Sequence, residues 1–267
     1  MPLIFMLLPI LLISFSSQAD DHIELYIPNS PPLASLAITS QGIAIYPIVE
    51  ALREIKIDAI LREIPWARAQ KKVSAGQSKL IAPLARTQAR EDQYIWIAPL
   101  LETNNVIFSL TKPAQSLSEA KNIYSRIGVG QGSAQAETLV EYGFKPQQII
   151  HLKLGENPGR LLRLGRIDGW FTSVTEGNHI WHNLLNETKP LKSSPILSST
   201  TLYLACSIDC DQNLIAKLRA IITPTAGPEQ NQSIKNPPPT QTTPPLSASH
   251  TTTSYHSTRK HRSNREL

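Results

Sequence analysis

Two periods of apolar and polar residues alternate along most of the chain. Short apolar runs of β-like texture, such as residues 22–28 and 79–84, are followed by segments whose apolar residues lie near helical spacing. In the segment 42–55, for example, Ile45, Ile48 and Leu52 recur at the spacing of one helix face. This alternation over residues 20–222 is typical of an α/β protein built of βαβ units.

The same pattern predicts the individual elements. Strands are expected at 22–28, 57–65, 79–84, 93–101, 123–130, 147–154, 167–173 and 199–207. Helices are expected at 42–55, 66–76, 133–143, 157–166 and 211–222, and a capping box of Ser116 and Glu119 is typical of a further helix start.

The two ends of the chain differ from this body. Residues 1–19 are an apolar run ending in Ser-Gln-Ala, which we interpret as a signal peptide cleaved after Ala19, although it begins without Lys or Arg. A membrane anchor is the alternative, but a spanning helix needs about 20 apolar residues and this run stops earlier. Residues 223–267 are rich in Pro, Thr, Ser and Gln, and we expect a disordered tail there, native or produced by a shifted reading frame.

Charge and cysteine usage narrow the class of protein. The formal net charge is +5, but the tail supplies +3 of it, so the nearly neutral body offers no basic face for nucleic acid. The only two cysteines, Cys206 and Cys210, are four residues apart. Export to an oxidising compartment favours a disulfide between them over free thiols. A metal site is disfavoured because two sulfurs with no further Cys or His nearby leave a tetrahedral ion half liganded.

No motif for hydrolysis, phosphate transfer or metal binding is visible, and we expect no cofactor and no metal. Asp168 and Glu176 could be imagined as an acid/base pair, but such pairs are common on solvated surfaces. The stretch 128–135, GVGQGSAQ, lacks the third glycine of a dinucleotide fingerprint because Ser133 stands there. It predicts either a turn that offers N–H groups to an anion at a helix N-terminus, or a plain turn capped by Ser133.

Two arginines stand out in the segment 82–92. Arg86 and Arg90 are four residues apart in a turn-like stretch between two strand-like runs, and nothing near in sequence is placed to neutralise both. An anionic ligand is one interpretation. The alternative is that Arg90 pairs with Glu91, Asp92 or a distant acid on the surface.

Six segments in order resemble the extracellular solute-binding proteins of polar amino-acid uptake systems, known as family 3. They are NSPPL, IPWARAQ, SAGQSKLIAPL, RTQARE, IGVGQGSAQ and LGRIDGW, and the resemblance covers residues 23–222. It implies a two-lobed periplasmic-binding fold in which each lobe is a mostly parallel sheet flanked by helices. Lobe 1 is expected at 20–108, lobe 2 at 109–203 and a return to lobe 1 at 204–222. It also implies a periplasmic monomer that serves an ABC-type permease or a sensor, with no stable membrane anchor.

The resemblance also implies a ligand site. Arg90, the arginine of its Thr87-x-x-Arg motif, is expected to reach into the cleft and grip a ligand carboxylate, and the turn Gly132-Ser133-Ala134 is expected to face it from lobe 2. Trp66 and Trp170 could line the pocket or pack in the core.

Specificity is where the chain departs from this family. Relatives that bind α-amino acids carry an acid for the ligand ammonium where this chain has Ser173, so we expect a carboxylate-bearing solute other than an ordinary amino acid. A dehydratase-like enzyme on the same fold and a degenerate sensory homologue are the alternatives.

Overall fold

The computed structural model describes residues 22–37, 41–155 and 157–222. The predicted signal peptide at 1–19 and the predicted tail at 223–267 lie outside the described residues. Within them the strands form one nine-stranded sheet in the order β2-β1-β3-β9-β4-β7-β5-β6, with β8 paired to β4. The pairs β1–β2, β1–β3, β5–β6 and β5–β7 are parallel, whereas the pairs that involve β4 or β9 are antiparallel.

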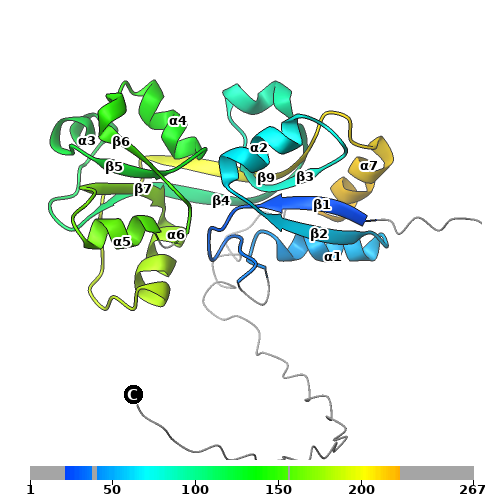
Figure 1. Cartoon of the computed structure of the whole chain (residues 1–267), viewed down its shortest axis with the longest axis horizontal. Helices are drawn as coiled ribbons and strands as arrows, with labels where there is room; N and C mark the ends of the chain where they lie inside the picture. Colours follow the sequence, from blue (N-terminus) through cyan, green and yellow to red (C-terminus); the bar gives the residue numbers. More distant parts are fainter. Residues whose placement is uncertain (1–21, 38–40, 156, 223–267) are drawn as a thin grey trace, which may run out of the picture. The chain divides into compact units, whose positions relative to one another are not determined.

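The elements gather into two groups along this sheet, which we call lobe 1 and lobe 2 (Figure 1). Lobe 1 contains β1 (His22–Ile27), α1 (Tyr46–Glu54), β2 (Asp58–Glu63), α2 (Trp66–Ser74), β3 (Leu80–Ala85), the 3-10 helix η1 (Gln88–Gln93) and α7 (Gln212–Ile221). Lobe 2 contains α3 (Leu117–Ile123), β5 (Ile127–Gly130), α4 (Ala134–Glu141), η2 (Pro146–Gln148), β6 (Ile149–Leu152), α5 (Asn157–Arg163), β7 (Gly169–Ser173), α6 (Val174–Asn178), the π-helix η3 (His179–Leu184) and β8 (Lys192–Ser193).

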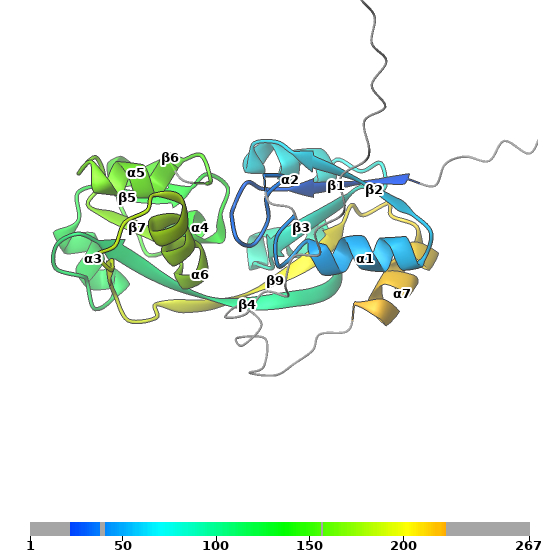
Figure 2. The same ribbon diagram turned by 90° about the horizontal axis from the view of Figure 1, so that it is seen from below.

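Two long strands, β4 (Ile95–Ser109) and β9 (Ser198–Cys206), belong to both lobes. They pair antiparallel from Ile95 opposite Cys206 to Asn105 opposite Ser198. Figure 2 shows them running side by side from one lobe to the other. The lobe boundaries predicted at 108/109 and 203/204 fall at the end of β4 and within β9.

Helices cover both faces of the sheet in each lobe. In lobe 1 the apolar positions predicted for α1, including Ile48 and Leu52, pack with α7 on one face, whereas Trp66 and Val73 of α2 pack on the other. In lobe 2 the helices α3 and α4 cover one face, and α5 with η3 covers the other. The fold is therefore the two-lobed α/β architecture that the sequence predicts.

Several elements differ from the sequence-based expectation. Strand β4 continues beyond the predicted end at 101 to Ser109, passing Pro99 at a register shift, where a residue without an N–H is tolerated. The helices α6 and η3 were not predicted from the sequence. Their residues 174–184 contain β-branched, Asn, His and Gly residues, which are weak helix formers.

The predicted disulfide between Cys206 and Cys210 is confirmed, and it joins the end of β9 to the turn before α7. Among the described residues, none of the helices has the length and apolar character needed to cross a membrane.

Candidate functional site

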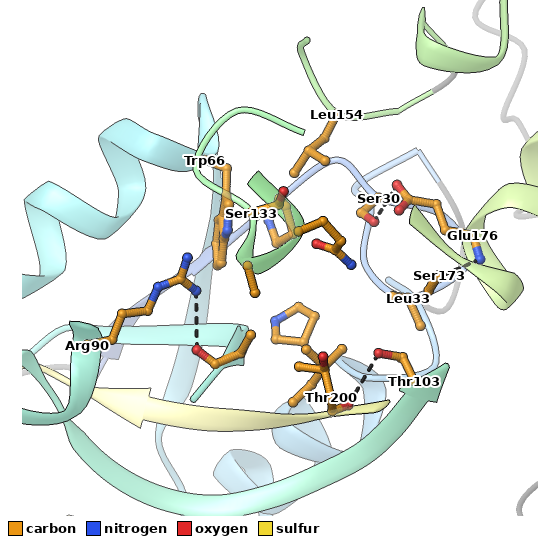
Figure 3. Close-up of a pocket in the computed structure, with 16 residues that line it drawn as sticks. Ser30, Leu33, Trp66, Arg90, Thr103, Ser133, Leu154, Ser173, Glu176 and Thr200 are labelled. Atoms are coloured by element: carbon orange, nitrogen blue, oxygen red, sulfur yellow. Dashed lines mark hydrogen bonds between the residues drawn. The ribbon is translucent and has the colours of Figure 1, made fainter. Parts of the chain in front are cut away.

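A cavity of about 70 Å³ lies where the two lobes face each other. One water molecule needs roughly 10–15 Å³ of such space, so the cavity has room for a small solute. Lobe 1, with the strands it shares, contributes Pro28, Ser30, Leu33, Trp66, Pro83, Ala85, Arg90, Thr103, Thr200 and Leu202. Lobe 2 contributes Ser133, Ala134, Gln135, Leu154, Ser173 and Glu176. Figure 3 shows Arg90 and Trp66 on one side of this pocket and Ser30, Ser173 and Glu176 on the other.

Arg90 lines the pocket but already has an acidic partner. Its Nε donates to Oε1 of Glu137 at 3.0 Å, and its second guanidinium nitrogen contacts the same carboxylate. The remaining guanidinium hydrogen bonds go to the carbonyl oxygens of Ala85 at 3.2 Å and Gly132 at 3.0 Å. The expectation that Arg90 is left without an internal acid is therefore wrong. Glu137 is distant in sequence and belongs to α4 of lobe 2, so the pair joins the two lobes. It is largely shielded from solvent, since the Arg90 side chain is 5% exposed and that of Glu137 is 31% exposed.

Local structure explains how this pair is assembled. Thr87 is extended and begins η1, which turns Arg90 back toward the end of β3. On lobe 2, Ser133 caps α4 and places Glu137 in the first turn of that helix. Thr87 Oγ1 donates to the second oxygen of Glu137 at 3.0 Å. Both the threonine and the arginine of the Thr87-x-x-Arg motif thus donate hydrogen bonds to one side chain of the facing lobe.

In the turn before α4, the carbonyl oxygen of Gly132 accepts hydrogen bonds from lobe 1. Gly132 has a φ of +77°, and its carbonyl oxygen accepts hydrogen bonds from Arg90 and, at 2.8 Å, from Gln70 Nε2 of α2. The N–H of Ser133 donates to the carbonyl of Gly130 at 3.1 Å, while its hydroxyl accepts from the N–H of Ala136. Ser133 is thus a helix cap, and it lines the pocket together with Ala134.

The opposite end of the pocket holds Glu176, which is 7% exposed. Its two carboxyl oxygens accept from Ser30 Oγ of lobe 1 at 2.8 Å and from Thr172 Oγ1 at 2.5 Å. Burial raises the pKa of Glu176, and the two hydroxyl donors offset only part of this effect. A buried carboxyl group without a basic partner is costly, so it is a candidate for a functional role.

Sequence reasoning missed the position of Glu176. Ser173 lines the pocket and caps α6, and its hydroxyl accepts from the N–H of Glu176 at 3.1 Å. One helical turn further on, the chain returns a carboxyl group to the same pocket. The pocket therefore contains an acid, Glu176, although the expected position of an acid is occupied by Ser173. An acid three residues after a capping serine was the available signal, but it required knowing that a helix begins there.

The other residues singled out in the sequence are divided between pocket and scaffold. Trp66 lines the pocket and also packs in the core of lobe 1, whereas Trp170 is buried in the core of lobe 2. Asp168 accepts from the backbone N–H groups of Ser125 and Arg126 and pairs with the Arg126 side chain, so its contacts are structural.

Arg86 lies outside the set of pocket-lining residues. It pairs with Glu91, and its guanidinium lies 5.4 Å from the ring centre of Trp96 and 5.6 Å from that of Tyr203. Its charge is therefore compensated at the surface by a neighbour in sequence and by two aromatic faces. Over residues 22–37, 41–155 and 157–222, no group of three or more His, Cys, Asp or Glu side chains is placed to hold a metal ion.

No protein-family model and no curated protein sequence matches this chain. Solved structures match it at the level of fold. A histidine kinase sensor domain with similarity to periplasmic binding proteins matches with a TM-score of 0.66 and 16% identity over 76% of this chain and 90% of the other. EhuB in complex with hydroxyectoine gives 0.66 and 16% over 80% and 84%. The arginine-bound ArgBP of T. maritima gives 0.63 and 13% over 75% and 94%.

Proposed function

We propose that this chain is a solute-binding protein of the periplasm that captures a small polar solute between its lobes. The observation that carries the proposal is the inter-lobe pocket, because polar side chains of both lobes line it and the two lobes are joined there by hydrogen bonds. A ligand held by groups from both lobes stabilises the closed arrangement, which is the physical basis of hinge closure on binding. Neighbours of the same fold that hold arginine or hydroxyectoine support this assignment.

The sequence-based version of this function has the solute bound through a carboxylate on Arg90. Such a carboxylate would have to displace Glu137 or share the guanidinium with it, because Glu137 already uses two of the guanidinium nitrogens. The roles of Thr87 and of the turn at Gly132 in ligand binding depend on the same displacement. We therefore retain capture of a small solute as the proposed function and treat the nature of its charged group separately below.

Native mass spectrometry of the protein purified from its own compartment tests the proposal directly. We expect a co-purifying small molecule that is lost on unfolding. A thermal-shift screen of amines, amino acids, carboxylates and neutral polyols is the complementary measurement, because a ligand at 100 times its dissociation constant adds about 2.7 kcal/mol of stability.

A matched pair of glutamines controls this screen. Gln135 lines the pocket and donates to Asn105 of β4, whereas Gln131, four residues earlier, is exposed. Gln135→Ala should reduce the ligand-induced shift, and Gln131→Ala should leave it unchanged. A protein that carries no molecule and responds to no compound of the screen would contradict the proposed function.

Delivery of the solute to an ABC-type permease and presentation to a sensor are both compatible with this function. The match to a histidine kinase sensor domain favours the sensory role as a second candidate. Co-purification of membrane partners with a tagged protein, with and without ligand, separates the two. A permease retained by the tagged protein supports uptake, and a kinase supports sensing.

The enzymatic alternative is a dehydratase-like activity, which needs a positioned acid or base in the pocket. Glu176 is a group of that kind. Turnover of prephenate or arogenate by the purified protein, abolished by Glu176→Gln, would establish this alternative in place of binding alone.

A further inference from the structure

We propose that the pocket selects solutes that carry a small cationic group, such as an ammonium or a guanidinium, and that lack a carboxylate. In this proposal Glu176 binds the cation, and Glu137 is a built-in carboxylate that excludes a ligand carboxylate from Arg90. The inference rests on the proposed solute-binding function and deepens it by naming the class of solute.

The charge balance of the pocket is the first step. Of the residues that line it, only Arg90 and Glu176 carry ionisable side chains. Arg90 is neutralised by Glu137, whose second oxygen is held by Thr87 at 3.0 Å, so both oxygens of that carboxylate have protein donors. The pocket therefore presents no uncompensated positive charge to a ligand. A ligand carboxylate placed at Arg90 would enter beside Glu137 and be repelled by it.

The state of Glu176 is the second step. Its contacts in the described structure are hydroxyl groups of Ser30 and Thr172, and its own backbone N–H binds Ser173. No basic side chain of the described residues forms an ion pair with it, and no charged group contributes to the shift of its pKa. His179, three residues further on, has its own pKa lowered by burial, which favours its neutral form. A ligand cation would thus supply the positive charge that no described side chain offers to the Glu176 carboxylate.

Position is the third step. Glu176 and Arg90 lie at opposite sides of the pocket in Figure 3, so a cation at Glu176 does not approach the guanidinium. Pro83, Leu33 and Leu202 line the same pocket and give apolar surface to the carbon chain of the solute. Ser30 comes from lobe 1 and donates to Glu176 of lobe 2, so a cation bound to this carboxylate lies at a contact between the two lobes.

Pairs of compounds that differ only in the α-carboxylate test this selection. Agmatine with L-arginine, putrescine with L-ornithine, and isobutylamine with L-valine form such pairs at three sizes. In isothermal titration calorimetry we expect at least one amine to bind about tenfold or more tightly than its amino acid, since a desolvated carboxylate left without a donor costs at least about that factor. An amino acid that binds as tightly as its amine, or no binding of any amine, overturns the inference.

Three variants assign the effect to the two acids. Glu176→Gln should abolish amine binding, because it removes the charge and keeps the shape. Glu137→Gln should admit the amino acids of the series, because it frees Arg90 for a ligand carboxylate. Glu141→Gln is the matched control, since Glu141 is an exposed acid on the same helix, and it should change neither affinity.

Two further readouts keep the test decisive. If Glu137→Gln does not fold, Thr87→Val removes one donor to Glu137 and should give a smaller gain in amino-acid binding. Amine affinity of the natural protein should increase as the pH rises above 4.5, because binding requires ionised Glu176. An affinity for amines that is independent of pH and of Glu176→Gln would place the cation elsewhere and overturn the inference. The proposed function itself fails only if the whole screen and the search for a co-purifying molecule are also negative.

Discussion

Arg90 of η1 and Glu137 of α4 form an ion pair that joins the two lobes beside the pocket, with Nε 3.0 Å from Oε1. The guanidinium is almost completely buried, and its other donors reach the carbonyl groups of Ala85 and Gly132. Four of the five N–H donors of this side chain are therefore used by the protein itself. The arginine of the Thr87-x-x-Arg motif, which we expected to bind a ligand carboxylate, here binds a carboxylate of the facing lobe.

The Arg90–Glu137 pair should contribute measurably to stability. A double-mutant cycle with Arg90→Met and Glu137→Gln, followed by urea unfolding, is expected to give a coupling free energy of about 1–3 kcal/mol, because a buried charge-assisted bond is involved. The pair of Arg86 and Glu91 is the matched control, since both side chains are more than one third exposed. Its cycle should give less than about 1 kcal/mol. Equal coupling energies for the two pairs would show that burial does not strengthen the inter-lobe contact.

The pH dependence of stability should report the burial of Glu176. Its folded pKa is raised above the ordinary value of 4.5, mainly by burial, so between these two values the folded state binds more protons than the unfolded state. The free energy of unfolding must then fall as the pH rises through that window. Glu176→Gln removes this dependence, and the variant should gain stability relative to the natural protein as the pH rises from 4.5 upward in urea unfolding. A stability difference that stays constant over this range would contradict the raised pKa.

Gly132 and Gly165 both have a positive φ, so alanine substitutions at the two positions distinguish the cost of backbone strain from the cost of a clash between the lobes. Gly165 has a φ of +64° and open space where a Cβ would lie, so Gly165→Ala should cost about 1–2 kcal/mol for the backbone alone. At Gly132, with a φ of +77°, an added Cβ would lie 3.2 Å from both Cα and Cβ of Ala67 on the facing lobe. Gly132→Ala should therefore lower the melting temperature more than Gly165→Ala does. Equal losses would mean that the lobes separate at this point without cost.

The disulfide between Cys206 and Cys210 should contribute modestly to stability. It closes a loop between residues only four apart, and the chain-entropy model gives about 2 kcal/mol for so short a loop. The double variant Cys206→Ala/Cys210→Ala should lose about that amount in urea unfolding. Reduction of the natural protein should have a similar effect. A loss above about 4 kcal/mol would indicate that packing of Cys206 and Cys210 in the core of lobe 1 dominates.

Local patterns carried much of the fold. The apolar spacing of α1 placed Ile48 and Leu52 on its buried face, and Ser133 was identified as a possible cap for α4 from its position after a glycine-rich turn. The helices α6 and η3 were not predicted because many of residues 174–184 are weak helix formers. Their helical structure depends on the cap that Ser173 provides and on the packing of Trp181 in the core of lobe 2. Strand β4 was predicted too short because the apolar run stops at residue 101 and the next four residues, Glu-Thr-Asn-Asn, are polar and include two Asn, which are depleted in strands.

The partners in the pocket could not be obtained this way. The acid that neutralises Arg90 lies 47 residues away along the chain, and Ser30, the lobe 1 hydroxyl that binds Glu176, lies 146 residues away. No periodicity or spacing within a segment encodes such a pair.

The sequence by itself determined the alternation of strands and helices and favoured the disulfide, because each depends on residues close in the chain, whereas a resemblance in a short motif pointed to Arg90 as a pocket residue. Only the tertiary structure decided that Arg90 is already neutralised and that Glu176 is a buried acid with no ion-pair partner among the residues that the structure describes. The physical reason is that charge compensation depends on distance in space, which the packing of the two lobes sets and the order of residues does not.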